Sequence, residues 1–121
     1  MPARETVEAL IALVEQGKYV EAIEQFYAED ASMQENNQPP RKGRAALVTH
    51  ERGVMASYRS LRTLPVETLL VDGDHVVIRW VFEFTRKDGK VLRLEEVALQ
   101  RWRGEKVMEE RFFYDPAQVR G

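Results

Sequence analysis

The stretch HVVIRWVFEFTRKDGKVLRLEEVALQRW, residues 75–102, decides the fold of this chain, because it reads as two long strands joined by a turn at Lys87, Asp88 and Gly89. Apolar residues alternate with other residues on both sides of the turn, which is the two-residue period of half-buried strands. A slip of one residue in the pairing would exchange the two faces of the sheet. The turn therefore determines which side chains face the interior.

Two registers are open at this turn. A two-residue Asp-Gly turn sets Lys87 against Lys90, whereas a three-residue loop with Gly89 in the left-handed bulge position sets Arg86 against Lys90. Both local pairs are repulsive, so pairs further along the strands must discriminate between the two forms.

The three-residue loop pairs Glu83 with Arg93, which is attractive. It also collects the apolar side chains on one face, namely Val76, Ile78, Trp80, Phe82, Phe84, Leu92, Leu94 and Ala98. We therefore predict this register, in which Glu96 lies opposite Trp80 on the inner face. Gln100 and Trp102 follow on the same face.

Apolar residues before these strands recur at helical spacing. They predict helices over residues 5–15, 19–27 and 43–60, with Gly17 ending the first. On the third helix the pattern places either His50 or Glu51 on the inner face. A brief strand is predicted over 30–36 and a loop over 37–42.

The remaining segments predict an edge strand over 64–71, because it contains Pro65, and a last strand over 107–114. Three helices followed by a meander of long strands indicate one α+β domain, residues 1–121, with the helices packed on one face of a mostly antiparallel sheet.

Composition excludes several function classes. The chain has no cysteine and two histidines, His50 and His75, so disulfides are excluded and we predict no metal site. A net charge of −2 argues against nucleic acid as a partner. No apolar run approaches the roughly 20 residues of a membrane span, and no signal core begins the chain, so we expect no membrane partner and a cytoplasmic location.

Three acidic residues are predicted to face the interior. The row Ala31, Met33, Glu35 points inward from the brief strand, and Glu96 points inward from the long hairpin. Continued alternation on the last strand turns the side chains of Met108, Glu110, Phe112 and Tyr114 inward as well. No internal cation is evident, and burial of an unpaired carboxyl raises its pKa, which suits a proton-transfer group.

Three stretches resemble motifs of the nuclear transport factor 2-like superfamily, within it the SnoaL-like group related to polyketide cyclases and ketosteroid isomerase. They are FYAEDASMQEN (26–36), GRAAL (43–47) and LQRWRGEKVMEERFFYDP (99–116). The resemblance implies a cystatin-like cone, in which a curved sheet wraps the helices around a pocket, and a homodimer paired through the outer sheet face. Apolar residues on that face fit such a dimer: Val77, Val81, Val97, Leu99 and Phe113.

The resemblance also implies a role for Glu35, which matches the aspartate that moves the proton in ketosteroid isomerase. The oxyanion donors of that enzyme are absent, since their positions fall near Leu10 or Ile11 and near Ala98. The aspartate of the related limonene epoxide hydrolases would fall at Phe112 and is also missing. Asp115 matches the end of the SnoaL-like motif, and we expect it to close the chain end.

Each candidate has a structural alternative. Glu35 could end an exposed edge strand, and Glu96 and Glu110 could be structural acids paired with an arginine such as Arg52 or Arg59. His50 is either a hydrogen-bonded wall residue or a proton relay facing the acids. The basic residues Arg41, Lys42 and Arg44 are expected to form a solvated loop.

The candidate catalytic residues are thus Glu35, Glu96, His50 and Glu110. The candidate ligand-binding residues are Tyr27, Met33, Tyr58, Trp80, Gln100, Trp102, Phe112 and Tyr114. Together they favour a small hydrophobic metabolite as ligand and cofactor-independent isomerase, cyclase or lyase chemistry, with Glu35 as base and Glu96 or Tyr114 as oxyanion donor. The alternative is a non-catalytic ligand-binding or dimerisation module, since one fold hosts both.

Overall fold

The computed structural model of the protein describes residues 1–120, and three α-helices and a seven-stranded sheet lie within this range. The helices are α1 (Arg4–Glu15), α2 (Tyr19–Phe26) and α3 (Arg44–Ser57). The strands are β1 (Tyr27–Glu35), β2 (Arg41–Lys42), β3 (Ser60–Thr63), β4 (Leu69–Asp72), β5 (His75–Thr85), β6 (Val91–Arg103) and β7 (Lys106–Phe113). A short 3-10 helix, η1 (Pro116–Val119), follows.

The hairpin of β5 and β6 has the predicted register. Glu83 pairs with Arg93, and Trp80 pairs with Glu96. The backbone N–H of Arg86 donates to the carbonyl of Lys90 at 2.8 Å, and Gly89 has a φ of +93°. That positive φ is the left-handed conformation that the third residue of such a loop requires, and glycine adopts it at least cost. The three-residue loop is therefore confirmed.

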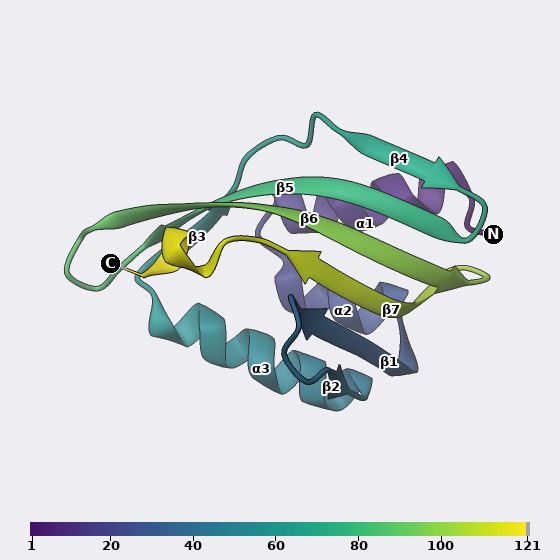
Figure 1. The fold of residues 1–121 in the computed structure, drawn as a ribbon, viewed down its shortest axis with the longest axis horizontal. Helices are drawn as coiled ribbons and strands as arrows, with labels where there is room; N and C mark the ends of the chain where they lie inside the picture. The colour runs from purple at the N-terminus through teal and green to yellow at the C-terminus, as the bar shows by residue number, and fades with distance from the viewer. Residues whose placement is uncertain (121) are drawn as a thin grey trace.

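The sheet is mixed and curved. Its strand order is β2-β1-β7-β6-β5-β3, with β4 also paired to β5. All pairs are antiparallel except β1 with β7, which run parallel. Figure 1 shows α1 and α2 behind the long strands and α3 along the lower edge beside β1 and β2. The predicted α+β class, with three helices before a mostly antiparallel sheet, is confirmed.

The core lies between the helices and the concave face of the sheet. Along β6 the side chains alternate strictly between exposed and buried, so Leu92, Leu94, Glu96, Ala98, Gln100 and Trp102 all face inward. Val7 and Leu10 of α1 are buried in the same cluster as Val76, Ile78 and Ala98 of the sheet. The inward face of the hairpin is thus the one that the sequence predicts.

Several predicted boundaries were wrong. Tyr27 belongs to β1 rather than to a helix, because its backbone is extended and pairs with Val107. Of the predicted strand over 64–71 only the end is a strand, β4, and the segment with Pro65 is irregular because proline donates no ladder hydrogen bond. The unpredicted strand β3 lies before this range. The third helix ends at Ser57, and part of the predicted loop forms β2.

Strand β7 carries an irregularity that the alternation did not predict. The register against β6 shifts between Arg101 and Trp102, so Trp102 pairs with Val107 while Gln100 pairs with Glu110. Val107 is consequently fully buried and Met108 is only partly buried. A bulge of this kind adds one residue to one strand and changes which neighbours face inward.

The outer face of the sheet is apolar in part. Val97, Leu99 and Phe113 are 41%, 38% and 41% exposed, whereas Val81 is buried, contrary to its predicted exposure. Val81 pairs with Glu95, which forms an ion pair with Arg79. The segment after β3 also runs beside Val81, since the backbone N–H of Leu64 donates to the Val81 carbonyl at 2.9 Å. In the described part of the chain, no helix has both the length and the apolar character that crossing a membrane requires.

Candidate functional site

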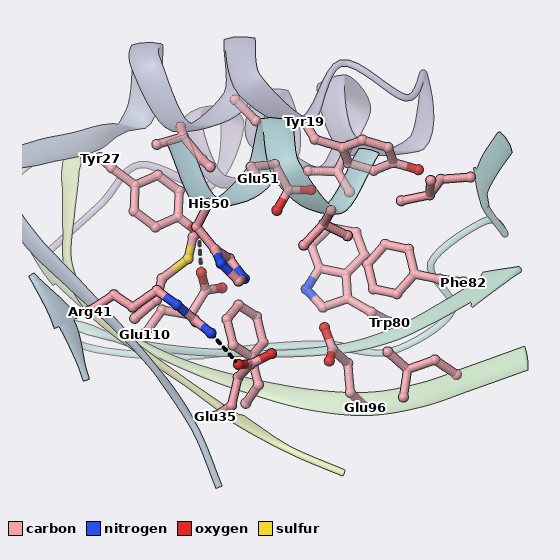
Figure 2. A pocket seen from close by; sticks show the side chains of 18 of the residues that line it. Tyr19, Tyr27, Glu35, Arg41, His50, Glu51, Trp80, Phe82, Glu96 and Glu110 are labelled. Atoms are coloured by element: carbon pink, nitrogen blue, oxygen red, sulfur yellow. Dashed lines mark hydrogen bonds and ion pairs between the residues drawn. The ribbon is translucent and has the colours of Figure 1, made fainter. Parts of the chain in front are cut away.

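A cavity of about 170 Å³ lies between the helices and the concave face of the sheet. Its walls are mainly apolar and aromatic, formed by Leu10, Val14, Tyr19, Ala22, Ile23, Tyr27, Met33, Val54, Leu61, Trp80, Phe82, Phe84, Leu94 and Phe112. Its polar lining consists of Glu35, Arg41, His50, Glu51, Glu96, Gln100 and Glu110. Figure 2 shows the labelled polar side chains converging on the space beside Trp80. The cavity therefore combines apolar walls with a few polar groups, as small-molecule sites do.

Glu35 lies near the open side of the cavity, with its side chain 32% exposed. The inward row of β1 brings it there, as predicted. Its carboxylate forms an ion pair with Arg41 at 2.8 Å and accepts a hydrogen bond from the hydroxyl of Tyr114 at 3.1 Å. Two groups thus hold the Glu35 carboxylate in one orientation.

The expectation that no internal cation accompanies the acids was wrong, because Arg41 is not a solvated loop residue. Arg41 pairs with Met33 across β1 and β2, so its side chain shares a face with Met33 and Glu35. The short strand β2 was not predicted, which is why this pair was missed. Arg44 also has a structural contact, since its guanidinium donates to the carbonyl of Tyr27 at 3.2 Å.

Glu96 is 9% exposed and projects from β6 into the cavity. Across residues 1–120 no hydrogen bond or ion pair to its carboxyl is found, and neither proposed arginine reaches it: the guanidinium of Arg59 donates to the carbonyl of Lys87, and Arg52 is exposed. Burial, followed by the nearby charges of other acids, raises the pKa of Glu96 to about 8. Glu96 is therefore protonated at neutral pH.

Glu110 is more deeply buried, but it has partners. It accepts hydrogen bonds from the hydroxyl of Tyr27 and from the Gln100 side-chain amide, the latter at 2.7 Å. The Gln100 carbonyl oxygen in turn accepts from the indole N–H of Trp102 at 3.0 Å. Burial raises the pKa of Glu110 to about 7, although these two donors oppose the rise. Glu110 thus belongs to a satisfied polar network in the cavity wall.

Helix α3 contributes two polar side chains, His50 and Glu51, from the side opposite the sheet (Figure 2). Burial and the Arg41 charge lower the pKa of His50, while Glu35 acts in the opposite direction. Burial and the Glu35 charge raise the pKa of Glu51, which Arg41 counteracts. No hydrogen bond to the His50 ring is found among the described residues.

Glu51 was not among the candidate residues. The helical pattern left open whether His50 or Glu51 faces inward, and the structure shows that both line the cavity. Neighbouring residues of a helix differ by about 100° in direction, so a wide cavity admits both.

Five of the predicted ligand-binding residues line the cavity: Tyr27, Met33, Trp80, Gln100 and Phe112. The other three lie outside its lining. Tyr58 stacks on Phe84 with ring centroids 5.0 Å apart, Trp102 is buried behind Gln100, and Tyr114 contacts the cavity only through its hydroxyl on Glu35. Tyr19 and Phe82, which were not predicted, are part of the wall.

Two further expectations concern the chain end and metals. The carboxylate of Asp115 accepts a hydrogen bond from the Ala117 N–H at 2.9 Å and caps η1, so its role in closing the chain end is confirmed. Within the described range, no group of three or more histidine, cysteine or acidic side chains is placed to hold a metal ion.

The sequence profile of the SnoaL-like domain matches residues 7–110. A similar solved structure is a candidate SnoaL-like polyketide cyclase from Mesorhizobium loti, 27% identical over 91% of this chain and 97% of that chain, with a TM-score of 0.77. A protein with a ketosteroid isomerase-like fold from Catenulispora acidiphila, in complex with trimethylamine, is 21% identical with a TM-score of 0.81, covering 97% and 90% of the two chains.

TerC, co-crystallised with polyporic acid, is 18% identical with a TM-score of 0.79, and the match covers 93% of this chain and 91% of TerC. At this identity, TerC and the Catenulispora protein establish the fold alone. No curated protein matches the chain significantly.

Proposed function

Because the chain belongs to the SnoaL-like domain family, we propose that it is a cofactor-independent acid–base enzyme acting on a small, largely apolar carbonyl compound held in the cavity. One observation carries the proposal. The carboxyl of Glu96 has no hydrogen-bond or ion-pair partner in the described range and projects into the same cavity as the ion-paired carboxylate of Glu35. Burial raises its pKa to about 8, which favours the neutral form at neutral pH. A neutral acid and a charged base in one apolar site are the pair that enolisation of a carbonyl compound requires.

In the proposed reaction the Glu35 carboxylate removes a proton from the carbon next to the carbonyl. The electron pair of that C–H bond forms a carbon–carbon double bond, and the carbonyl oxygen takes the negative charge. The carboxyl of Glu96 donates a hydrogen bond to that oxygen, as preorganised donors do in oxyanion sites. In an isomerase reaction Glu35 then returns the proton at another carbon. In a cyclase reaction the enolate carbon instead attacks a second carbonyl carbon of the same molecule, the C–O π bond breaks, and that oxygen takes the proton from Glu35.

Arg41 and Tyr114 are positioning residues in this scheme, since both bind Glu35. His50 lies across the cavity, where it is the second candidate for proton transfer. Glu110 is assigned a supporting role, because its oxygens are occupied by Tyr27 and Gln100. Two fold relatives were crystallised with small molecules, polyporic acid and trimethylamine, which supports a ligand-binding role for this fold.

Proton abstraction can be tested without the natural substrate. A panel of monocyclic and bicyclic ketones, including 2-tetralone, is incubated with the protein in D₂O, and NMR follows loss of the protons next to the carbonyl. Wild type is expected to accelerate the exchange, and Glu35→Gln to reduce the acceleration by about 100-fold or more, the usual contribution of a general base.

A matched control is Glu109→Gln, since Glu109 is on β7 but faces solvent, paired with Arg101. Its exchange rate should equal that of wild type. Equal rates in wild type and Glu35→Gln would contradict the assignment of the base. Ketone binding without exchange across the whole panel would favour the alternative, a non-catalytic ligand-binding module.

We also propose that the protein forms a homodimer through the outer face of the sheet. Val97 pairs with Phe113, and Leu99 lies two residues along β6, so the exposed apolar side chains form one patch. An exposed patch of this kind typically marks an interaction surface.

A further inference from the structure

The cavity has more acidic groups than its own cation can neutralise. Four carboxyl groups line it, from Glu35, Glu51, Glu96 and Glu110, against the single guanidinium of Arg41. That guanidinium is already paired with Glu35, and Glu110 is held by neutral donors. Glu51 and Glu96 remain, and no hydrogen bond or ion pair to either carboxyl is found between Met1 and Arg120. Because no fully buried side-chain oxygen in this range lacks a partner, the unpaired carboxyl oxygens face the open cavity.

These two carboxyl groups belong to opposite walls. Glu51 projects from α3 and Glu96 from β6, and Figure 2 shows both directed into the space beside the indole ring of Trp80. Glu96 is a polar side chain that is nine-tenths buried, without a partner, and aimed into an open cavity. The oxygens of this carboxyl reach the open cavity and no side chain of the described range occupies them, so they are available to a ligand with complementary charge or hydrogen bonding.

Aromatic rings form the wall between the two acids. Trp80 stacks on Phe82 with ring centroids 5.8 Å apart, and Tyr19 meets Phe82 edge to face at 6.3 Å. The face of an aromatic ring, and of tryptophan most strongly, attracts a cation within about 6 Å of its centroid. Carboxylates beside aromatic faces suit a diffuse, partly apolar positive charge.

The arrangement does not suit a metal ion. A divalent cation needs several oxygen ligands converging at about 2.0 to 2.6 Å. In the described range no three acidic or histidine side chains converge in this way. An alkylammonium group is larger and needs no such convergence, and Glu51, Glu96 and Trp80 all line the one cavity that would hold it.

We propose that the cavity binds a small organic cation of the alkylammonium class, held between Glu51 and Glu96 and against the ring of Trp80. This binding activity goes beyond the proposed ketone chemistry, which needs Glu96 in its neutral form. The cation instead binds to the ionised carboxyl, so the two ligand classes select different protonation states of one residue.

The affinity of the site for a permanent cation should depend on pH. Burial and neighbouring acids raise the pKa of Glu96 to about 8, and burial raises that of Glu51. The charged and titratable groups around Glu96 come from every adjacent wall, namely Glu35 of β1, Arg41 of β2, His50 and Glu51 of α3, Glu110 of β7, and Tyr114 after β7. Raising the pH ionises Glu96 and strengthens binding, and binding below pH 8 releases protons to the buffer.

The test compares choline with 3,3-dimethylbutan-1-ol, which has the same shape but a carbon in place of the charged nitrogen. Both are titrated into the wild-type protein at pH 6.0 and pH 8.5, and NMR follows the indole N–H signals. Choline is expected to bind about tenfold or more tightly than the alcohol at pH 8.5. The preference should shrink at pH 6.0, and calorimetry in buffers of different ionisation enthalpy should detect proton release at pH 7.5.

Variants identify the groups responsible. Glu51→Gln and Glu96→Gln should each lower choline affinity about tenfold and leave the affinity for the alcohol unchanged, whereas Glu109→Gln should alter neither. Equal affinities for choline and the alcohol at both pH values would overturn the proposal, and this comparison needs no variant to fold. Ketone exchange with no choline preference would reject the cation site alone, while choline preference without exchange would reject only the proposed chemistry.

Discussion

Replacing Glu96 with glutamine should make the protein more resistant to alkaline pH. The pKa of Glu96 is raised from 4.5 to about 8 in the folded protein, whereas the unfolded chain keeps the ordinary value. Between these two values the folded state holds a proton that the unfolded state has released. The stability associated with the neutral carboxyl is therefore fully present below pH 4.5 and is lost progressively as the pH rises to about 8.

The magnitude follows from the size of the shift. Each pKa unit corresponds to about 1.4 kcal/mol, so a shift from 4.5 to 8 amounts to about 5 kcal/mol over the full range. Between pH 5 and pH 8 the wild type should lose about 3 to 4 kcal/mol of unfolding free energy relative to Glu96→Gln, whose amide does not titrate. The two proteins share all other titrating groups, so the difference between them isolates Glu96.

The assay is urea-induced unfolding of both proteins from pH 5 to pH 8, followed by circular dichroism. The difference in unfolding free energy between Glu96→Gln and wild type should increase with pH in favour of the variant, whatever its value at pH 5. Glu109→Gln provides the control, since Glu109 is exposed and its carboxylate is held by Arg101. Parallel curves for wild type and Glu96→Gln would refute the argument that Glu96 is neutral in the folded protein.

Three further outcomes are expected. Gly89→Ala should destabilise the protein by about 1 kcal/mol in urea unfolding, because Gly89 has a φ of +93°. Gly53→Ala should instead stabilise α3 by a similar amount, since a Cβ there meets nothing within 4 Å, and a loss of stability at both sites would contradict the left-handed role of Gly89. Gln100→Ala should lower the free energy of unfolding by about 2 kcal/mol or more, because it leaves the Trp102 N–H and one Glu110 oxygen without partners. Gln100→Glu, measured alongside it, should not restore the wild-type free energy of unfolding. Leu99→Glu should convert the proposed dimer to a monomer in analytical ultracentrifugation, whereas Val91→Glu, at the end of the hairpin, should leave the dimer intact. A wild-type protein that is already monomeric would reject the proposed dimer.

The hairpin register could be predicted because alternation and charge pairing agree over many residues. Glu83 opposite Arg93 and the apolar row ending at Ala98 both require the three-residue loop, so a single error in either would not change the conclusion. The interior positions of Glu96 and Gln100 then followed from periodicity alone. Long regular strands carry redundant information, and the deepest part of the cavity is built from such strands.

The missed features depend on contacts between segments distant in sequence or on very short elements. Strand β2 has two residues, too few to show a period, and the position of Arg41 beside Glu35 depends on it. The pairing of β1 with β7 is parallel and joins strands that lie far apart in the sequence, so no local pattern predicts it. The inward turn of Glu51 depends on the width of a cavity that only the assembled walls define.

Burial does not distinguish the roles of the acids, but hydrogen-bond partners do. Glu96 and Glu110 lie on neighbouring strands and are 9% and 3% exposed, so burial would penalise the charge of Glu110 at least as much. Nevertheless the pKa of Glu110 rises only to about 7 and that of Glu96 to about 8. Tyr27 and Gln100 donate to Glu110 and oppose its rise, whereas neighbouring acids, Glu110 first, add to the rise at Glu96. A buried acid whose oxygens are occupied is held in place and unavailable to a ligand, whereas one without partners is free to donate a proton to a ligand or to receive its charge. The unoccupied carboxyl of Glu96 is therefore what the proposed chemistry and the proposed cation site both require, and Glu110 serves neither despite its deeper burial.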